Sequence, residues 1–211
     1  MAGKIIAIIA NGESLTTDWS RDNLKDASVI IAADGGALLC RELDIHPDYI
    51  VGDMDSISDE LKNTFSESEF ILRPDQNSTD MQKSIEFAIS LSPVLIKIFS
   101  SFGKRIDHTI ANILLFQEYE TSVPLVIYDN YGRMSLLSPG NHSLRGRIGM
   151  IVSMFSLNPI KNLVLDGFRY PVEGKSFPDS FIGVSNVYEK EVGHVSFDSG
   201  KLFLYEMLNN E

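Results

Sequence analysis

Short apolar runs rich in β-branched residues alternate with amphipathic stretches between residues 5 and 128. This alternation is typical of parallel strands that are joined by crossover helices. Parallel strands are covered on both faces, and most of the runs are almost continuously apolar, as such burial requires. The predicted strands are residues 5–10, 28–33, 49–51, 70–72, 94–99 and 125–128.

Two of the intervening stretches show helical periodicity. In the first, which follows Thr79, the apolar stripe consists of Met81, Ile85, Ala88 and Ile89. In the second, which includes Asp107, the stripe consists of Ile106, Ile110, Ile113, Leu114 and Gln117. Both stretches are predicted to be amphipathic helices, and Ser78 or Thr79 can cap the first one.

The pattern changes near Arg133, where short β-rich runs are separated by Gly, Pro, Asn and Asp and no helical period remains. This change predicts a small all-β domain, a sandwich, that begins in the turn at residues 129–132. The predicted fold is therefore an α/β N-terminal domain with a mostly parallel, Rossmann-like sheet, residues 1–130, followed by an all-β sandwich C-terminal domain, residues 131–211.

Charge and composition exclude several classes of function. The chain has 18 Lys and Arg against 29 Asp and Glu, a net charge of −11, and no basic stripe, so we expect no nucleic-acid partner. No apolar run approaches the ~20 residues of a membrane helix, and the six apolar residues near the start are too short for a signal peptide. With a single cysteine, Cys40, no internal disulfide can form. We expect a cytoplasmic protein without a membrane partner.

Acidic residues follow the predicted strand at 49–51. Asp53 and Asp55 lie in the segment Gly52-Asp53-Met54-Asp55-Ser56. Open α/β sheets bind ligands at the carboxyl ends of their strands, and two carboxylates there could share a hard cation such as Mg²⁺. The alternative is that both aspartates cap the next helix.

Two other strand ends carry related signals. Asp34-Gly35-Gly36 ends one strand and opens a helix, which suits a phosphate-binding turn or a simple glycine turn. Asp75 and Asp80 flank the start of the helix after Thr79 and could lie at the same edge of the sheet as Asp53. Asp80 alone could instead stabilise the helix dipole.

A cationic segment follows the predicted strand at 94–99. Lys104 and Arg105 precede Asp107 and His108 at the start of a predicted helix. A guanidinium can bind phosphate bidentately and an ammonium binds it as a point charge, so this loop suits phosphate oxygens. The alternative is a solvated loop in which Asp107 caps the helix.

These four strand-end segments, in this order, resemble the signatures of the thiamine pyrophosphokinase family. Residues 167–171 and 183–186 look like the two C-terminal signatures of that family. The resemblance implies an enzyme that transfers a pyrophosphoryl group from ATP to the hydroxyl of thiamine, giving thiamine diphosphate and AMP, with Mg²⁺ as cofactor. It also implies a nucleotide-binding catalytic domain at 1–130, a thiamine-binding and dimerisation domain at 131–211, and a homodimer that holds thiamine at the subunit interface.

The resemblance also implies roles for individual residues. Mg²⁺ and the phosphates would be held by Asp53, Asp55 and Asp80, with Asp34 in support. Arg105 and Asp107 would complete the catalytic set on the nucleotide side. Gln76 and Thr79 would face the pyrimidine of thiamine, and Ser185 and Asn186 would close its pocket. The remaining predicted binding residues are Gly35, Gly36, Asp75, Lys104 and His108.

Other functions remain open at this point. An acidic loop at a strand end also suits another Mg²⁺-dependent nucleotide or pyrophosphoryl transferase with a pterin or sugar acceptor. A catalytically dead module that binds nucleotide or thiamine is the alternative outside enzymes. Either Asp80 or Asp107 could accept the proton of the acceptor hydroxyl.

Overall fold

The computed structural model describes residues 3–119 and 122–208. The chain divides into two compact units, Met1–Asn130 and Tyr131–Glu211. The first unit contains both helices and strands, and the described part of the second unit contains strands only.

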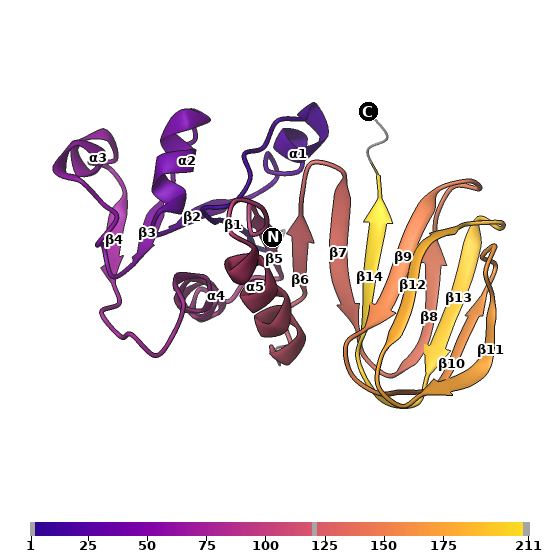
Figure 1. The fold of residues 1–211 in the computed structure, drawn as a ribbon. Helices are drawn as coiled ribbons and strands as arrows, with labels where there is room; N and C mark the ends of the chain where they lie inside the picture. The colour runs from indigo at the N-terminus through magenta and orange to yellow at the C-terminus, as the bar shows by residue number, and fades with distance from the viewer. Residues whose placement is uncertain (1–2, 120–121, 209–211) are drawn as a thin grey trace. The chain divides into compact units, whose positions relative to one another are not determined.

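The first unit is built on six parallel strands (Figure 1). They lie in the order β6-β5-β1-β2-β3-β4, and every neighbouring pair is parallel. Each predicted strand of this half is confirmed to within two residues at either end. The bounds are β1 Ile5–Ile9, β2 Val29–Ala33, β3 Tyr49–Gly52, β4 Glu69–Leu72, β5 Leu95–Phe99 and β6 Leu125–Tyr128.

Helices cover both faces of this sheet. Figure 1 shows α1 (Asp18–Asp22), α2 (Gly36–Glu42) and α3 (Asp59–Thr64) on one face, and α4 (Asp80–Ser90) and α5 (Ile106–Glu118) on the other. The central strand β1 is therefore buried on both sides, and its residues Ile6, Ile8 and Ile9 are completely inaccessible to solvent. Burial of each such side chain contributes about 1.5–3 kcal/mol to the stability of the fold, so these residues fix β1 in the sheet.

The predicted helix after Thr79 is confirmed as α4. Of the two candidate caps, Thr79 is the N-cap, and its hydroxyl accepts a hydrogen bond from the backbone N–H of Gln82 at 3.2 Å. Met81, Ile85 and Ala88 of the predicted stripe are buried. The apolar period therefore identified the face that packs on the sheet.

The second predicted helix is confirmed as α5, but its predicted apolar stripe is largely exposed. Ile106, Ile110 and Leu114 are exposed, whereas Phe116 and Gln117 are the buried residues of this helix. The helical period shows which residues share a face, and it does not show what covers that face.

The second unit consists of two antiparallel sheets that share one hydrophobic core. One sheet has the order β7-β14-β9-β12 and the other has the order β8-β13-β10-β11. Buried and accessible residues alternate along β9 and β13, as expected for sheets with one face on a core. The arrangement is sandwich-like. The bounds are β7 Gly132–Leu137, β8 Gly140–Arg145, β9 Ile151–Ser156, β10 Ile160–Asp166, β11 Val172–Phe177, β12 Phe181–Val187, β13 Val192–Phe197 and β14 Leu202–Met207.

Within residues 3–119 and 122–208, no helix has the length and apolar character needed to cross a membrane.

Candidate active site

The ends of β2 and β3 lie against each other at Asp34. Its backbone N–H donates to the carbonyl oxygen of Val51 at 2.8 Å. On β3, a Cβ at Gly52 would lie 2.7 Å from the Cβ of Asp34, so only glycine leaves room for this contact. Asp34 is thereby fixed at the carboxyl edge of the sheet, next to the end of β3 and the loop that carries Asp53.

Asp34 is a buried carboxylate in a strained conformation. Its side chain is 5% exposed, its φ is +38°, and Oδ1 has no hydrogen-bond partner among the described residues. A buried carboxylate oxygen without a hydrogen-bond donor destabilises the fold unless a cation or another positively charged group approaches it. Strain and an unpartnered oxygen together are typical of a binding site.

The loop after β3 presents Asp53 toward the loop after β4. Asp53 Oδ1 accepts from the N–H of Asp55 at 3.1 Å, and Asp53 Oδ2 accepts from Gln76 Nε2 at 3.1 Å. These donors, Asp55 first and Gln76 second, hold the pKa of Asp53 below its usual value. Asp53 is therefore ionised, and Asp55 is exposed beside it.

The alternative that Asp53 and Asp55 cap the next helix is wrong. Helix α3 begins only at Asp59, and its N-cap is Ser58, whose hydroxyl accepts from the N–H of Leu61 at 3.2 Å. The two aspartates have no part in ending or starting this helix.

Asp80 is the first residue of α4 and lies at the same edge of the sheet. We call Asp34, Asp53 and Asp80 the acidic edge. Burial raises the pKa of this half-buried carboxyl above its usual value, and the negative charges of Asp34 and Asp53 raise it further. The charges of Asp34 and Asp53 therefore both act on Asp80, and a cation at this edge of the sheet would offset them.

Lys83 is a member of this edge that the sequence analysis missed. Its ammonium lies 3.3 Å from Asp80 Oδ1, and its side chain is 5% exposed. The sequence contained one sign of it, namely an Asp-x-x-Lys spacing at a helix start. That spacing does not show whether the lysine is buried.

The donors of this edge suit a hard divalent cation. Among the described residues, no three His, Cys, Asp or Glu side chains are close enough together to hold a metal ion by themselves. Mg²⁺ commonly takes only one or two carboxylates from the protein and fills its remaining positions with water and substrate phosphate oxygens. The unpartnered oxygen of Asp34 and the negative charges that act on Asp80 fit such an ion, whose remaining positions water or phosphate oxygens can fill.

The loop between β4 and α4 is organised by Asp75. Its carboxylate accepts hydrogen bonds from the backbone and side chain of Asn77, at 3.1 and 2.9 Å, and from Ser78 Oγ at 3.1 Å. The Asn77 N–H first and the Ser78 hydroxyl second lower the pKa of Asp75. Asp75 thus closes the loop that brings Gln76 to Asp53, and Thr79 caps the helix that follows.

The loops after β1 and β5 are joined to each other by backbone hydrogen bonds. The N–H of Gly12 donates to the carbonyl of Ser100 at 2.6 Å, and that of Glu13 donates to Phe102 at 2.7 Å. A Cβ at Gly12 would lie 2.2 Å from both carbonyl oxygens, so glycine is required there. Each loop fixes the other.

Asn11 connects this pair of loops to the glycine turn after β2. Its Oδ1 accepts from Lys104 Nζ at 3.0 Å, and its Nδ2 lies against Gly35. The sequence analysis missed Asn11. Its only signal was an Asn-Gly step after the first strand, which is also ordinary turn chemistry.

Arg105 and Asp107 form an ion pair with each other. Arg105 Nε lies 3.1 Å from Asp107 Oδ1, and a second guanidinium nitrogen contacts Oδ2. This guanidinium lowers the pKa of Asp107 to about 2. Both side chains are exposed, and His108 is exposed next to them on α5. The pair uses Nε and one terminal nitrogen of Arg105, so the other terminal nitrogen keeps its N–H donors for a phosphate oxygen.

In the second unit, Ser185 and Asn186 lie at an irregularity of β12. Ser185 has a φ of +56°, is exposed, and donates its N–H to Ser153 Oγ at 3.0 Å. Asn186 is 2% exposed, and its amide accepts from the N–H of Tyr170 and donates to the carbonyl of Tyr170, both at 2.9 Å. Of this pair, Ser185 faces outward, and Asn186 holds the Tyr170 segment.

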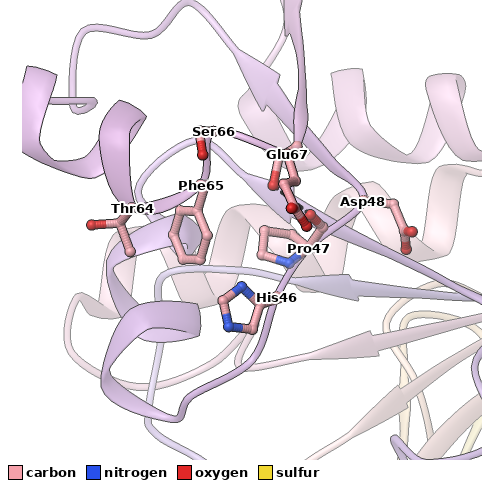
Figure 2. Close-up of a pocket in the computed structure, with 8 residues that line it drawn as sticks. His46, Pro47, Asp48, Thr64, Phe65, Ser66 and Glu67 are labelled. Carbon is pink, nitrogen blue, oxygen red and sulfur yellow. Dashed lines mark hydrogen bonds between the residues drawn. The ribbon is translucent and has the colours of Figure 1, made fainter.

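A cavity of about 450 Å³ lies at the amino ends of β3 and β4, opposite the carboxyl ends that carry the predicted site. Figure 2 shows its lining side chains, which come from the last residue of α3 and from the loops that precede these strands. Asp48 Oδ2 accepts from the N–H of Ile30 at 2.7 Å, so its carboxylate already has a partner in the sheet. The lining contains none of the predicted site residues, and it consists of His46, Pro47, Asp48, Thr64, Phe65, Ser66, Glu67 and Ser68.

Comparison with known families decides between the alternatives. Residues 21–127, just over half of the chain, match the family model of the thiamin pyrophosphokinase catalytic domain. The chain belongs to the thiamine pyrophosphokinase family. Residues 141–202 match the vitamin B1 binding domain of the same enzymes. The family predicted from the motifs is thus confirmed.

Thiamine pyrophosphokinases from distant organisms align with almost the whole chain. The Bacillus subtilis enzyme is 24% identical over 208 residues, covering 95% of this chain and 97% of that protein. The thiamine pyrophosphokinase 1 of rice is 26% identical over 222 residues, covering 90% and 81%.

Solved thiamine pyrophosphokinase structures share the fold. The Bacillus subtilis structure superposes with a TM-score of 0.83 at 23% identity, covering 97% of this chain and 99% of that one. The Candida albicans structure gives 0.82 at 20% identity, covering 97% and 89%.

Proposed function

We propose that this chain is a thiamine pyrophosphokinase, which transfers the pyrophosphoryl group of ATP to the hydroxyl of thiamine and releases AMP and thiamine diphosphate. The observation that carries the proposal is the acidic edge formed by Asp34, Asp53 and Asp80, in a chain that matches both domains of this family. Pyrophosphoryl transfer needs positioning and neutralisation of charge more than it needs covalent chemistry. Acidic residues with a metal ion can supply both.

The two units would divide the work. We assign residues 1–130 as a Rossmann-like nucleotide-binding catalytic domain and residues 131–211 as a thiamine-binding and dimerisation domain. The parallel sheet with helices on both faces supports the first assignment, because such sheets bind nucleotides at their carboxyl edge. The match of residues 141–202 to a vitamin B1 binding domain supports the second.

In this proposal Asp53, Asp55 and Asp80 are the candidate ligands of Mg²⁺, water and phosphate oxygens would fill the positions that these carboxylates do not reach, and Asp34 would complete the negative charge around the ion. When bound, Mg²⁺ neutralises the phosphate oxygens and orients them for displacement. Gln76 would fix the direction of Asp53 through the hydrogen bond between them. The hard oxygen donors of this edge support Mg²⁺ over a softer metal.

The phosphates would meet the glycine turn and the cationic loop. Gly35 and Gly36 let a phosphate approach the backbone, and Lys104, held by Asn11, supplies a positive charge beside them. Arg105 would bind a phosphate oxygen through the guanidinium donors that Asp107 leaves unused. With a pKa of about 2, Asp107 is a weak base, so we assign it the orientation of Arg105, with His108 beside it.

Thiamine would be held by residues of both units in a homodimer, with its pocket at the subunit interface. Gln76 and Thr79 would face the pyrimidine, and Ser185 would contact thiamine directly. Asn186 would act by holding the Tyr170 segment, because its amide groups are already used. The resemblance to the family supports this arrangement. We place the reaction in the cytoplasm, where a chain with one buried, unpaired cysteine is stable.

The test is to incubate the purified protein with ATP, Mg²⁺ and thiamine and to separate the nucleotides and thiamine phosphates by chromatography. We expect AMP and thiamine diphosphate in equal amounts, and neither product when thiamine is omitted or a chelator is added. ADP with thiamine monophosphate would contradict pyrophosphoryl transfer. Tight binding of ATP and thiamine without any product would support the dead-site alternative.

A further inference from the structure

Lys83 occupies a position that is unfavourable for a lysine in two respects. It lies at the end of the first turn of α4, where the positive end of the helix dipole disfavours a cation. Its side chain is also 5% exposed, and removing an ammonium from water costs solvation free energy unless it is paired. Negative charges nearby must offset both effects.

Those charges come from the acidic edge. Lys83 donates to Asp80 Oδ1 at 3.3 Å. Helix α4, which carries both residues, packs on β2 and β3, the strands that end at Asp34 and directly before Asp53. Oδ1 of Asp34 has no partner among the described residues. The ammonium therefore pairs with Asp80 at the sheet edge to which we assign the metal, and the proposed reaction has not yet given it a role.

Helix α3 provides an internal comparison. Asp59 and Lys62 have the same i, i+3 spacing at a helix start, with 3.4 Å between carboxylate and ammonium. Their side chains are 96% and 50% exposed, against 38% and 5% for Asp80 and Lys83. The two pairs differ in burial and in acidic neighbours, so the α3 pair is the natural control.

We propose that Lys83 is the resident counter-cation of the acidic edge: its ammonium holds Asp80 and its neighbouring carboxylates together while no divalent cation is bound. Lys83 thus balances the charge of the acidic edge before the metal binds, and it competes with the metal ion for Asp80. The inference rests on the proposed function only in taking this edge as a divalent-cation site, and it requires no particular acceptor.

The test compares the thermal unfolding of the full chain in EDTA and in saturating Mn²⁺, without nucleotide or thiamine. In EDTA, we expect Lys83→Met to lower the midpoint by about 5–10 °C, because the carboxylates lose their buried partner. Saturating Mn²⁺ should restore at least half of that loss, because the ion replaces the missing charge. Lys62→Met should shift the midpoint by less than about 2 °C under both conditions.

Two further measurements keep the proposal falsifiable. By calorimetry, Lys83→Met should bind Mn²⁺ about tenfold more tightly than the unmodified protein, because one competing positive charge is gone. If Lys83→Met does not fold, the double variant Lys83→Met/Asp80→Asn should fold, since it removes the repulsion along with the lysine. Failure of that double variant as well would contradict the proposal.

A merely structural lysine gives a different result. Loss of packing would lower the midpoint equally with and without Mn²⁺, and that outcome would overturn the proposal. Weaker Mn²⁺ binding in Lys83→Met would overturn it too. None of these measurements involves turnover, so failure of the thiamine assay leaves them intact, and their failure leaves the assignment of the reaction intact.

Discussion

The two units place their candidate binding residues on different kinds of structure. In the first unit, the candidate residues lie in loops and helix starts at the carboxyl ends of parallel strands, as Asp34, Asp53 and Lys104 do. In the second unit, Ser185 and Asn186 lie within a strand, at an irregularity of its pairing. The comparison teaches that a loop can change its side chains without disturbing the sheet, whereas a residue within a strand serves the fold and the ligand together. Substitutions in the two units should therefore fail in different ways.

The largest effect should come from the first unit, with Asp55→Ala. Asp55 is exposed, so the fold should be unchanged, but turnover should fall by at least about 100-fold because a proposed ligand of the metal is lost. Steady-state assays at saturating Mg²⁺ measure this. Asp59→Ala, an exposed aspartate at the start of α3, should have no effect. Near-normal turnover by Asp55→Ala would remove that loop from the metal site.

Asn186→Ala should show the opposite behaviour in the second unit. The buried amide holds both backbone groups of Tyr170, so its loss should lower the free energy of unfolding by about 2–4 kcal/mol. Urea denaturation followed by circular dichroism measures this change. A stable Asn186→Ala protein that has lost only thiamine binding would contradict the difference drawn between the two units, because a residue within a strand would then serve the ligand alone.

Ser185→Ala should separate the two roles within one strand. The side chain is exposed, so stability should be unchanged, while the KM for thiamine should rise about three- to tenfold through the lost contact. The KM for ATP should not change. Ser143→Ala, a serine on β8, is the control. An effect confined to ATP would contradict the thiamine role of Ser185.

The smallest effect concerns the ion pair of Arg105 and Asp107. Because the pKa of Asp107 is lowered to about 2, the contribution of this pair is fully present above the ordinary value of 3.8 and is lost as the pH falls through about 2. An NMR titration of the Asp107 carboxyl should show a midpoint near 2. In Arg105→Gln, it should return toward the ordinary value. An unchanged midpoint in that variant would assign the shift to another partner.

The fold of the first unit was predictable because burial on two sides leaves almost continuous apolar runs, such as the one in β1. The strand-end aspartates were predictable because their position in an α/β sheet is informative by itself. The burial of Lys83 was not predictable, because Asp59 and Lys62 in α3 have the same spacing in the sequence as Asp80 and Lys83 in α4, although only Lys83 is buried. Nor could the sequence show that the Asn186 amide is consumed by Tyr170, which lies 16 positions away and meets it only in the folded chain.

The joined loops after β1 and β5 have a consequence for the affinity of the proposed nucleotide site. Gly12 and Glu13 donate their amide protons to partners about ninety positions away in the chain, so these protons should exchange slowly with solvent although they belong to loops. Lys104 and the glycine turn are then in place before any ligand arrives. Binding does not have to reduce the conformational freedom of these loops, and a larger share of each phosphate contact remains as affinity.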